Sequence, residues 1–233
     1  TTEIYTLSLH DALPIFWALG IVLNVEVPAT LKINVEGNFQ KFVSSKDLIL
    51  HIIGKITAEG ANFRVMEFHG STIRKMPTSG RLVLCNMSVE AGATSGIVPP
   101  DEETVRYLKE EAGVQETIEM ISPDENARYE QVIDIQIDNL EPQIACPHTV
   151  DNIKPIREIA GKKIQQIVIG SCTNGRLDDL QVAAEILKGK KVARSVRALV
   201  FPASARVFQK ALEKGYVSDL TKAGVVKIGR AHV

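Results

Sequence analysis

The sequence has few aromatic residues, few cysteines, no excess of charge of either sign and no long hydrophobic run. Lysine and arginine number 27 against 28 aspartates and glutamates, so the formal net charge is −1. Such a chain has no basic field to attract nucleic acid or an anionic membrane surface. The longest apolar runs, 18–23 and 48–53, fall far short of the roughly 20 residues that a membrane span needs. We therefore expect neither a nucleic-acid partner nor a membrane segment.

The three cysteines exclude a protein that is held together by a framework of disulfide bonds. An odd, small number in a chain of this size does not form a disulfide framework, and it is typical of a reducing compartment. We therefore expect a cytoplasmic protein. With 233 residues, 45% of them hydrophobic, the chain can build one large domain or two ordinary ones. A small molecule or another protein is the expected partner.

Both ends of the chain differ from ordinary protein sequence. Residues 1–15, TTEIYTLSLHDALPI, show no signal-peptide pattern and no helical or strand period. Fifteen codons of a sequencing adapter translate into the same residues, and the opposite adapter translates into IGRAHV at 228–233. We expect both ends to be non-native tails on an internal part of a longer protein. Residues 16–29 are then the remnant of a preceding domain.

The first half of the remaining chain predicts a small α/β domain over 30–145. Residues 30–36 alternate apolar and polar side chains as a half-buried strand does, and apolar residues then recur at helical spacing until Gly60. Ser45 or Asp47 is the expected cap of that helix, and Asp101 is the expected cap of a later one. Further strands are predicted over 63–69 and 129–137, and further helices over 77–93, which ends near Gly92, and 102–111.

Residues 139–159 hold three prolines and predict an extended linker between domains. The pattern after it alternates strands with helices over short connections, which favours a parallel sheet. We expect a second domain to begin here and to occupy 146–227. Its predicted elements are a buried strand over 163–170, a helix over 177–187, a strand over 196–201 and a helix over 205–214.

The sequence GSCTNG at 170–175 is the sharpest candidate site, because it lies between a predicted strand and a predicted helix. The carboxyl end of a strand in an open α/β sheet is where ligands bind. Cys172 there would lie near the start of the following helix, which favours the thiolate that metals and electrophiles need. The alternative is a tight turn that contains an inert small residue. No phosphate-binding glycine spacing is present.

Asn86 and Glu90 form a second candidate, four residues apart in the helix predicted over 77–93. That spacing places both side chains on one face, where they could bind substrate and hold an acid or base. Spacing alone favours the alternative, a solvated helix face.

Other candidates have a structural interpretation. Cys146 and His148 lack the further ligand pairs of a zinc site, and Cys85 is typical of a core residue. His51 and His69 show no partner in the sequence.

Four segments together resemble one known family. They are GSCTNGRLDDLQVAAEILKGKKV, LCNMSVEAGATSGIVPPDEETVRYL, ILHIIGK and EPQIACPHTVDNIKP. The resemblance is to the large subunit of 3-isopropylmalate dehydratase, in the aconitase superfamily, and it covers nearly all of 16–226. It implies aconitase-like three-layer α/β/α domains that are incomplete here, namely one small domain and the first part of a second.

The resemblance also implies a function. The expected enzyme is a cytosolic hydro-lyase of leucine biosynthesis that moves a hydroxyl group between adjacent carbons of a branched malate. Its cofactor is a [4Fe-4S] cluster held by three cysteines, and Cys172 matches the first of them. Asn86 and Glu90 match the N-x-x-x-E site helix of the superfamily, which handles the iron-bound hydroxyl or water. The resemblance therefore favours a site at Asn86 and Glu90 over the solvated helix face that their spacing alone favours.

Some expected features are missing. The Cys-x-x-Cys pair that supplies the other two ligands would follow Lys227, and this sequence contains no such pair. An Asp-Ser-His segment and a further active-site histidine would precede Phe16. The small subunit, which the family needs to bind substrate carboxylates, is a separate chain. We therefore expect this polypeptide alone to be inactive.

Two alternatives stay open. A homoaconitase-type large subunit shares these motifs and acts on a related hydroxy-tricarboxylate. A relative without a cluster that binds RNA is a different class of protein, and it would need a basic face with stacking aromatic residues. A net charge of −1 and 5% aromatic residues give that class no support.

Overall fold

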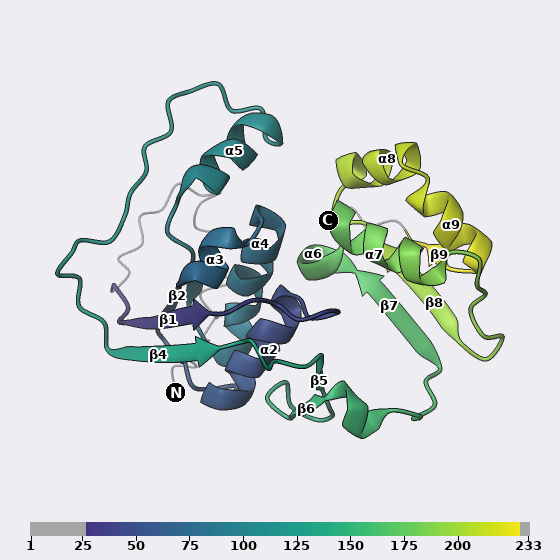
Figure 1. Ribbon diagram of the computed structural model, residues 1–233, viewed down its shortest axis with the longest axis horizontal. Helices are drawn as coiled ribbons and strands as arrows, with labels where there is room; N and C mark the ends of the chain where they lie inside the picture. The colour runs from purple at the N-terminus through teal and green to yellow at the C-terminus, as the bar shows by residue number, and fades with distance from the viewer. Residues whose placement is uncertain (1–26, 229–233) are drawn as a thin grey trace, which may run out of the picture.

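The computed structural model describes residues 27–228, which form two α/β units connected by residues 156–165 (Figure 1). The α/β class predicted from the sequence is therefore confirmed. The first unit consists of β1 (Thr30–Glu36), α2 (Ser45–Ile56), β2 (Val65–His69), α3 (Ser71–Lys75), α4 (Thr78–Met87), η1 (Ser88–Ala91), β3 (Ser95–Ile97), α5 (Glu102–Glu110), β4 (Gln131–Gln136), β5 (Gln143–Ala145) and β6 (Ile153–Pro155). After η2 (Ile156–Ile159), the second unit consists of β7 (Gln166–Gly170), α6 (Ser171–Asn174), α7 (Leu177–Leu187), β8 (Arg197–Phe201), α8 (Ala205–Glu213), α9 (Tyr216–Ala223) and β9 (Val226–Lys227).

The first sheet is parallel throughout, in the order β3-β2-β1-β4. Leu31, Ile33 and Val35 of β1 are buried, and the residues between them are partly exposed. Side chains on a strand alternate between its faces, so one face of this sheet forms the core and the other carries polar groups. Strand β1 has the predicted bounds. Strand β2 begins two residues later than predicted, because Phe63 lies in a turn with a φ of 58°.

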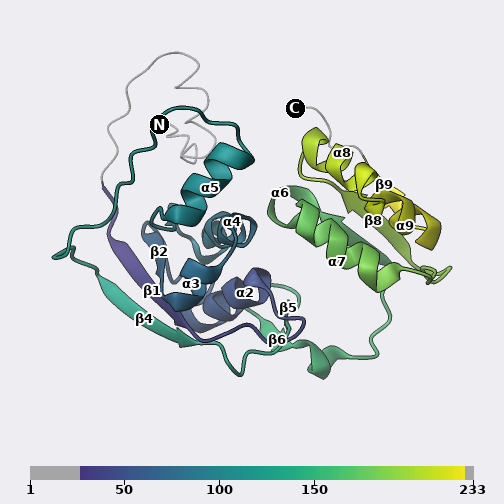
Figure 2. The ribbon, with the colours of Figure 1, turned by 45° about the horizontal axis from the view of Figure 1, so that its top comes forward.

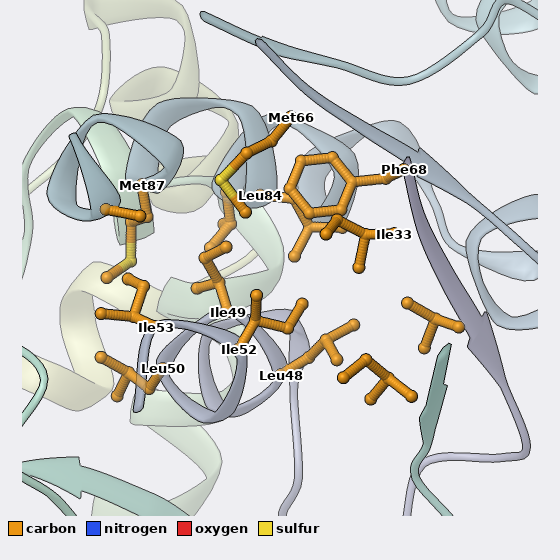
Figure 3. Close-up of a cluster of buried hydrophobic side chains, with 14 of the residues drawn as sticks. Ile33, Leu48, Ile49, Leu50, Ile52, Ile53, Met66, Phe68, Leu84 and Met87 are labelled. Carbon is orange, nitrogen blue, oxygen red and sulfur yellow. The ribbon is translucent and has the colours of Figure 1, made fainter. Parts of the chain in front are cut away.

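Helix α2 supplies much of the core of the first unit (Figure 3). Its apolar residues at helical spacing face β1, β2 and α4, as the sequence predicts. Burying each such side chain stabilises the fold by about 1.5–3 kcal/mol relative to leaving it exposed. The fully buried members from α2, the strands and α4 include Leu48, Ile49, Ile52, Ile53, Ile33, Met66, Phe68 and Leu84.

The start of α2 differs from the prediction by one residue. Ser44, not Ser45 or Asp47, is the N-cap residue. Asp47 instead occupies the third helical position, where its Oδ2 accepts hydrogen bonds from the Ser44 backbone N–H at 2.7 Å and the Ser44 hydroxyl at 2.8 Å. This is the geometry of a capping box. The helix also ends earlier than Gly60, because Thr57 adopts a φ of 71°.

The single helix predicted over 77–93 is divided in the structure. Helix α4 ends at Met87, and the tighter 3-10 turn η1 follows it. The hydroxyl of Ser88 donates to the Leu84 carbonyl at 2.9 Å, a bond that competes with regular helix geometry. Gly92 then closes the turn in the left-handed region with a φ of 82°, as predicted.

The segment over 139–159 is not the extended linker that its prolines suggested. Strands β5 and β6 form an antiparallel hairpin within it, and this hairpin packs against α2. The Gln143 N–H donates to Asp47 Oδ1 at 2.7 Å, and the Ala58 N–H donates to Asp151 Oδ2 at 3.0 Å. The boundary expected between Ala145 and Cys146 falls inside this hairpin. The domain bounds themselves stay a prediction.

The second unit has a parallel sheet in the order β7-β8-β9. Its core lies between β8 and helices α7, α8 and α9, and it includes Leu180, Ala184, Ala198, Val200, Ala211 and Leu220. Strand β7 is at the edge of the sheet, and Val168 is 55% exposed, so the prediction of a buried strand there was wrong. Val168 is exposed, whereas Ile167 and Ile169 on either side of it are partly buried against the core of the second unit.

The tails expected over 1–15 and 228–233 fall almost wholly outside the described residues, as does most of 16–29. Ile228 is described, and its N–H donates to the Val200 carbonyl at 3.0 Å. Within residues 27–228, no helix combines the length and the apolar character needed to cross a bilayer.

Candidate active site

Glu90 borders a hollow of about 470 Å³ in the first unit. Its carboxylate comes from η1, and its side chain is exposed. The hollow lies between the start of α2, the end of α4 with η1, and the β5 hairpin strand. Its other lining residues are Ser44, Lys46, Asp47, Leu50, Met87, Gln143, Ile144, Ala145 and Val150. Glu90, which the sequence singled out, therefore lies at a concavity, and its catalytic role stays a prediction.

Asn86 and Glu90 do not share a continuous α-helix. Asn86 lies in the last turn of α4, whereas Glu90 lies in the tighter turn of η1. Both residues are exposed. Since a 3-10 turn has 3.0 residues per turn, the α-helical face on which the prediction placed the pair is not kept beyond Met87. Whether the two residues act together stays a prediction.

Asp47 is held tightly at the wall of the Glu90 hollow. Its two carboxylate oxygens accept three hydrogen bonds, two from Ser44 and one from the backbone N–H of Gln143. This carboxylate thus joins the start of α2 to β5. From the sequence, Asp47 could be predicted only as a helix cap, because the contact with Gln143 joins positions nearly a hundred residues apart.

Cys172 lies in the short helix α6, directly after the edge strand β7. The backbone reaches it through two positive φ angles, 118° at Gly170 and 73° at Ser171. The side chain of Cys172 is outside what the structure describes. The following long helix, α7, begins only at Leu177, so the intervening α6 separates Cys172 from the start of the helix that the sequence placed next to it.

Asp179 fixes the turn that carries Cys172. Its Oδ1 accepts a hydrogen bond from the Asn174 amide at 3.0 Å, and its Oδ2 accepts one from the Arg176 backbone N–H at 3.0 Å. Burial raises the pKa of this carboxyl, while the two hydrogen bonds act in the opposite direction. Asn174 Oδ1 and Arg176 Nε are buried here without a hydrogen-bond partner among the described residues. The turn therefore keeps polar atoms available for a further group.

A groove of about 780 Å³ lies between the two units, beside this turn. The first unit lines it with the segment before α2 and with α4, and the second lines it with β7 and α7. Its walls are mainly apolar and include Phe39, Phe42, Met76, Val83, Ile167, Val168, Val182 and Ile186. The Ser79 hydroxyl, from the α4 side, donates to Asp178 Oδ2 of α7 at 2.7 Å.

The structure brings the predicted site elements close together. Helix α4, which carries Asn86, lies beside α6, which carries Cys172 (Figure 2). Ser44 and Lys46 line both the groove and the Glu90 hollow. The two concavities therefore meet at the start of α2. Lys46 could not be singled out from the sequence, because a single exposed lysine has no distinguishing pattern.

The remaining candidates do not join this site in the described structure. Burial raises the pKa of the Cys85 thiol to about 11, in agreement with a core role. His69 is not without a partner, as the sequence suggested: its Nε2 lies 2.6 Å from Glu67 Oε1, and the Tyr129 hydroxyl donates to the same oxygen at 3.1 Å. Glu67 and His69 are separated by one residue of β2, so both project from the same face.

Across residues 27–228, no three histidine, cysteine, aspartate or glutamate side chains come together as metal ligands. A four-iron cluster requires several thiolates. The described residues alone therefore do not supply its donor set, although the polar atoms at the Cys172 turn are compatible with a bound group.

Comparison with known proteins identifies the family. The Aconitase family (aconitate hydratase) matches residues 17–163 and 152–231. The chain belongs to the aconitase family. Membership implies an iron–sulfur cluster in general terms.

Relatives within the aconitase family carry two kinds of name. The 3-isopropylmalate dehydratase large subunit of Elusimicrobium minutum is 50% identical over 89% of this chain and 50% of its own length. A protein named as a probable 3-isopropylmalate dehydratase large subunit, from Methanothermobacter thermautotrophicus, is 46% identical over 86% of this chain and 47% of its own. A probable methanogen homoaconitase large subunit of Methanosarcina mazei is 45% identical over 86% and 50%.

The chain thus spans about half the length of the curated relatives it matches. Among solved structures, aconitase X of Thermococcus kodakaraensis superposes with a TM-score of 0.47 at 18% identity, over 87% of this chain and 44% of that one.

Proposed function

We propose that this chain is part of the large subunit of a hydro-lyase that interconverts 2-isopropylmalate and 3-isopropylmalate by dehydration and rehydration, in leucine biosynthesis. The proposal is supported by relatives named for 3-isopropylmalate dehydratase at 43–50% identity. Its active form is a heteromer with a small subunit, in the cytoplasm. The observation that carries it is the position of Glu90, in a hollow that meets the groove beside the Cys172 turn.

The proposed roles follow from the chemistry of each side chain. Dehydration of a hydroxy acid removes a proton from one carbon and a hydroxyl from the next, and rehydration reverses both. The Glu90 carboxylate exchanges a proton with the leaving or entering hydroxyl, as a general acid and base does. The Asn86 amide donates a hydrogen bond to the same group. Cys172 is proposed as one thiolate ligand of a [4Fe-4S] cluster whose other ligands lie outside the described residues.

A homoaconitase-type activity is the second candidate. It is favoured by the Methanosarcina mazei relative, which is 45% identical to this chain. The two candidates differ in what the substrate carries on its branch, an alkyl group in isopropylmalate and a further carboxylate in the tricarboxylate. Turnover of each substrate by the assembled enzyme decides between them.

Substitutions at Glu90 and Asn86 test the catalytic roles. In a large subunit that contains this sequence, assembled with its small subunit, Glu90→Gln and Asn86→Ala should lower kcat for 3-isopropylmalate dehydration. A positioned acid or base contributes about 10²–10⁴-fold to a rate, so a loss of that order is expected for Glu90→Gln. Because both side chains are exposed, the free energy of unfolding should change by no more than about 0.5 kcal/mol.

The matched control is Glu102→Gln. Glu102 is another exposed glutamate, in the first turn of α5 and outside the Glu90 hollow. This variant should keep the full rate. Wild-type kcat in Glu90→Gln would show that Glu90 is not the acid or base.

A further inference from the structure

Lys46 lies between the two concavities of the candidate site. It is the second residue of α2, its side chain is exposed, and it lines both the Glu90 hollow and the groove between the units. Its position in the first turn does not stabilise α2, because a positive charge there opposes the helix dipole. Local helix stability therefore does not explain the lysine.

No carboxylate among the described residues pairs with the ammonium group of Lys46. Among the described residues, no ion pair or hydrogen bond to its Nζ is found. The adjacent Asp47 is not its partner, since both oxygens of that carboxylate accept hydrogen bonds from Ser44 and Gln143. The other charged groups that line the Glu90 hollow are Asp47 and Glu90, both acidic. Without Lys46, the lining described for this hollow would carry two carboxylates and no cation.

The two carboxylates and the one lysine of this lining restrict which substrates can enter the Glu90 hollow. A hydroxy dicarboxylate that brings its hydroxyl to Glu90 also brings its own negative charges close to Asp47 and Glu90. Like charges at short range repel, so such an anion needs a cation at the same place. On its other side Lys46 faces the apolar groove, whose lining includes Val168, Val182 and Ile186. A ligand with a charged end and a branched alkyl end would therefore meet Lys46 with its charged end and the apolar groove with its alkyl end.

We propose that Lys46 binds a carboxylate of the hydroxy-acid substrate and so permits the substrate to approach Glu90. This rests on the proposed function and names a substrate-binding residue for it. The bond is a charge-assisted hydrogen bond from the ammonium to a carboxylate oxygen, and it acts as a point charge with freely rotating donors.

Binding of malonate, a dicarboxylate that cannot be dehydrated, tests the proposal directly. Calorimetric titration of the 233-residue chain should show that Lys46→Gln binds malonate about tenfold to a hundredfold more weakly than wild type. Lys46→Arg should recover most of the affinity, because it restores the charge. Lys41→Gln is the control, since Lys41 lies over the Phe42 ring at 5.0 Å and not in the Glu90 hollow. Its affinity should equal that of wild type.

Salt dependence adds a readout that a structural role would not change. Malonate affinity of the wild-type chain should fall as NaCl is raised, and Lys46→Gln should lose most of that dependence. In the assembled enzyme, Lys46→Gln should raise KM for 3-isopropylmalate by about tenfold or more with a smaller change in kcat.

The outcomes separate this proposal from the proposed function. Equal malonate affinity of wild type and Lys46→Gln, or no malonate binding by wild type, overturns the role of Lys46. Lys46-dependent malonate binding together with no turnover of isopropylmalate supports Lys46 and overturns the proposed reaction.

Discussion

Arg81 and Asp101 form a bidentate ion pair that joins α4 to the residue that caps α5. The two nitrogen–oxygen distances are 2.6 Å for Nη1 to Oδ1 and 2.8 Å for Nη2 to Oδ2. The guanidinium also donates to the carbonyls of Met76 and Arg74, at 2.9 and 3.0 Å. One buried arginine therefore connects the end of α3, the start of α4 and the start of α5. Through α4 it supports the segment that carries Asn86.

Replacing Arg81 should be strongly destabilising. The Arg81 side chain is 5% exposed, so Arg81→Met leaves Asp101 and two carbonyls without their hydrogen-bond donor in a partly buried site. Breaking a buried pair in this way costs about 3–5 kcal/mol, and urea denaturation of the chain measures it. Arg106→Met is the control, because the pairs of Arg106 with Glu103 and Glu110 are exposed and contribute at most about 1 kcal/mol. Equal losses in the two variants would contradict this account.

Stability should fall in acid, in part through Glu103. Hydrogen bonds from Arg106, and from the backbone and hydroxyl of Thr78, lower its pKa from 4.5 to about 2. The unfolded chain therefore binds more protons than the folded one in this range, so stability rises with pH. The contribution of Glu103 is complete above about pH 4.5 and is lost as the pH falls through about 2.

The variant Glu103→Gln isolates that contribution. Urea denaturation at pH 5 and at pH 2.5 should show a larger loss of stability in wild type than in Glu103→Gln. Other carboxyls with a lowered pKa, such as Asp101 beside Arg81, titrate in both proteins and cancel in the comparison. Parallel losses in the two proteins would show that Glu103 contributes nothing.

The sequence predicted those elements whose cause is local. The alternation over 30–36 gave β1 its bounds, because burial of one strand face acts on every second residue. The β5–β6 hairpin was missed because its strands have three residues each and are held by contacts with α2, far away in the sequence. The break of the helix after Met87 was missed for a related reason. It depends on the bond from the Ser88 hydroxyl to Leu84 and on the close approach of β3 at Gly96.

In the candidate site, too, the sequence predicted only those residues whose signal is local. Glu90 could be proposed from its spacing to Asn86 and from family resemblance, since both are properties of a short segment. Lys46 could not, because its importance arises from two concavities formed by elements across the whole described chain. The role of Asp179 was equally hidden, because it depends on how the turn after β7 folds back on α7.

Cys85 should be chemically inert in the native chain. Burial raises the pKa of its thiol to about 11, so at pH 8 about one molecule in a thousand carries the reactive thiolate. Treatment with iodoacetamide at pH 8, followed by mass spectrometry of peptides, should leave Cys85 unmodified. The same treatment in urea should modify it fully, which controls for detection of the peptide. Rapid native modification would mean that the site opens readily to solvent.

Gly175 should be required for the turn that carries Cys172. A Cβ atom added there would lie 2.6 Å from the Phe201 carbonyl oxygen and 2.7 Å from that of Ser171, both rigid backbone atoms. The Gly175 carbonyl also accepts a hydrogen bond from the Ala203 N–H at 2.8 Å, so the turn cannot move away without losing this bond. Gly175→Ala should therefore destabilise the chain by about 1–3 kcal/mol.

Hydrogen exchange at the Ala203 amide tests where that cost arises. Gly189→Ala is the matched control, because Gly189 has a positive φ of 72° but no atom within 4 Å of an added Cβ. It should also destabilise, by about 1–2 kcal/mol, through backbone strain alone. The Ala203 amide should lose its protection in Gly175→Ala and keep it in Gly189→Ala, because exchange reports local opening. Unchanged protection in Gly175→Ala would mean that the turn after β7 accommodates a side chain, and that its glycine is not what brings Cys172 beside α4.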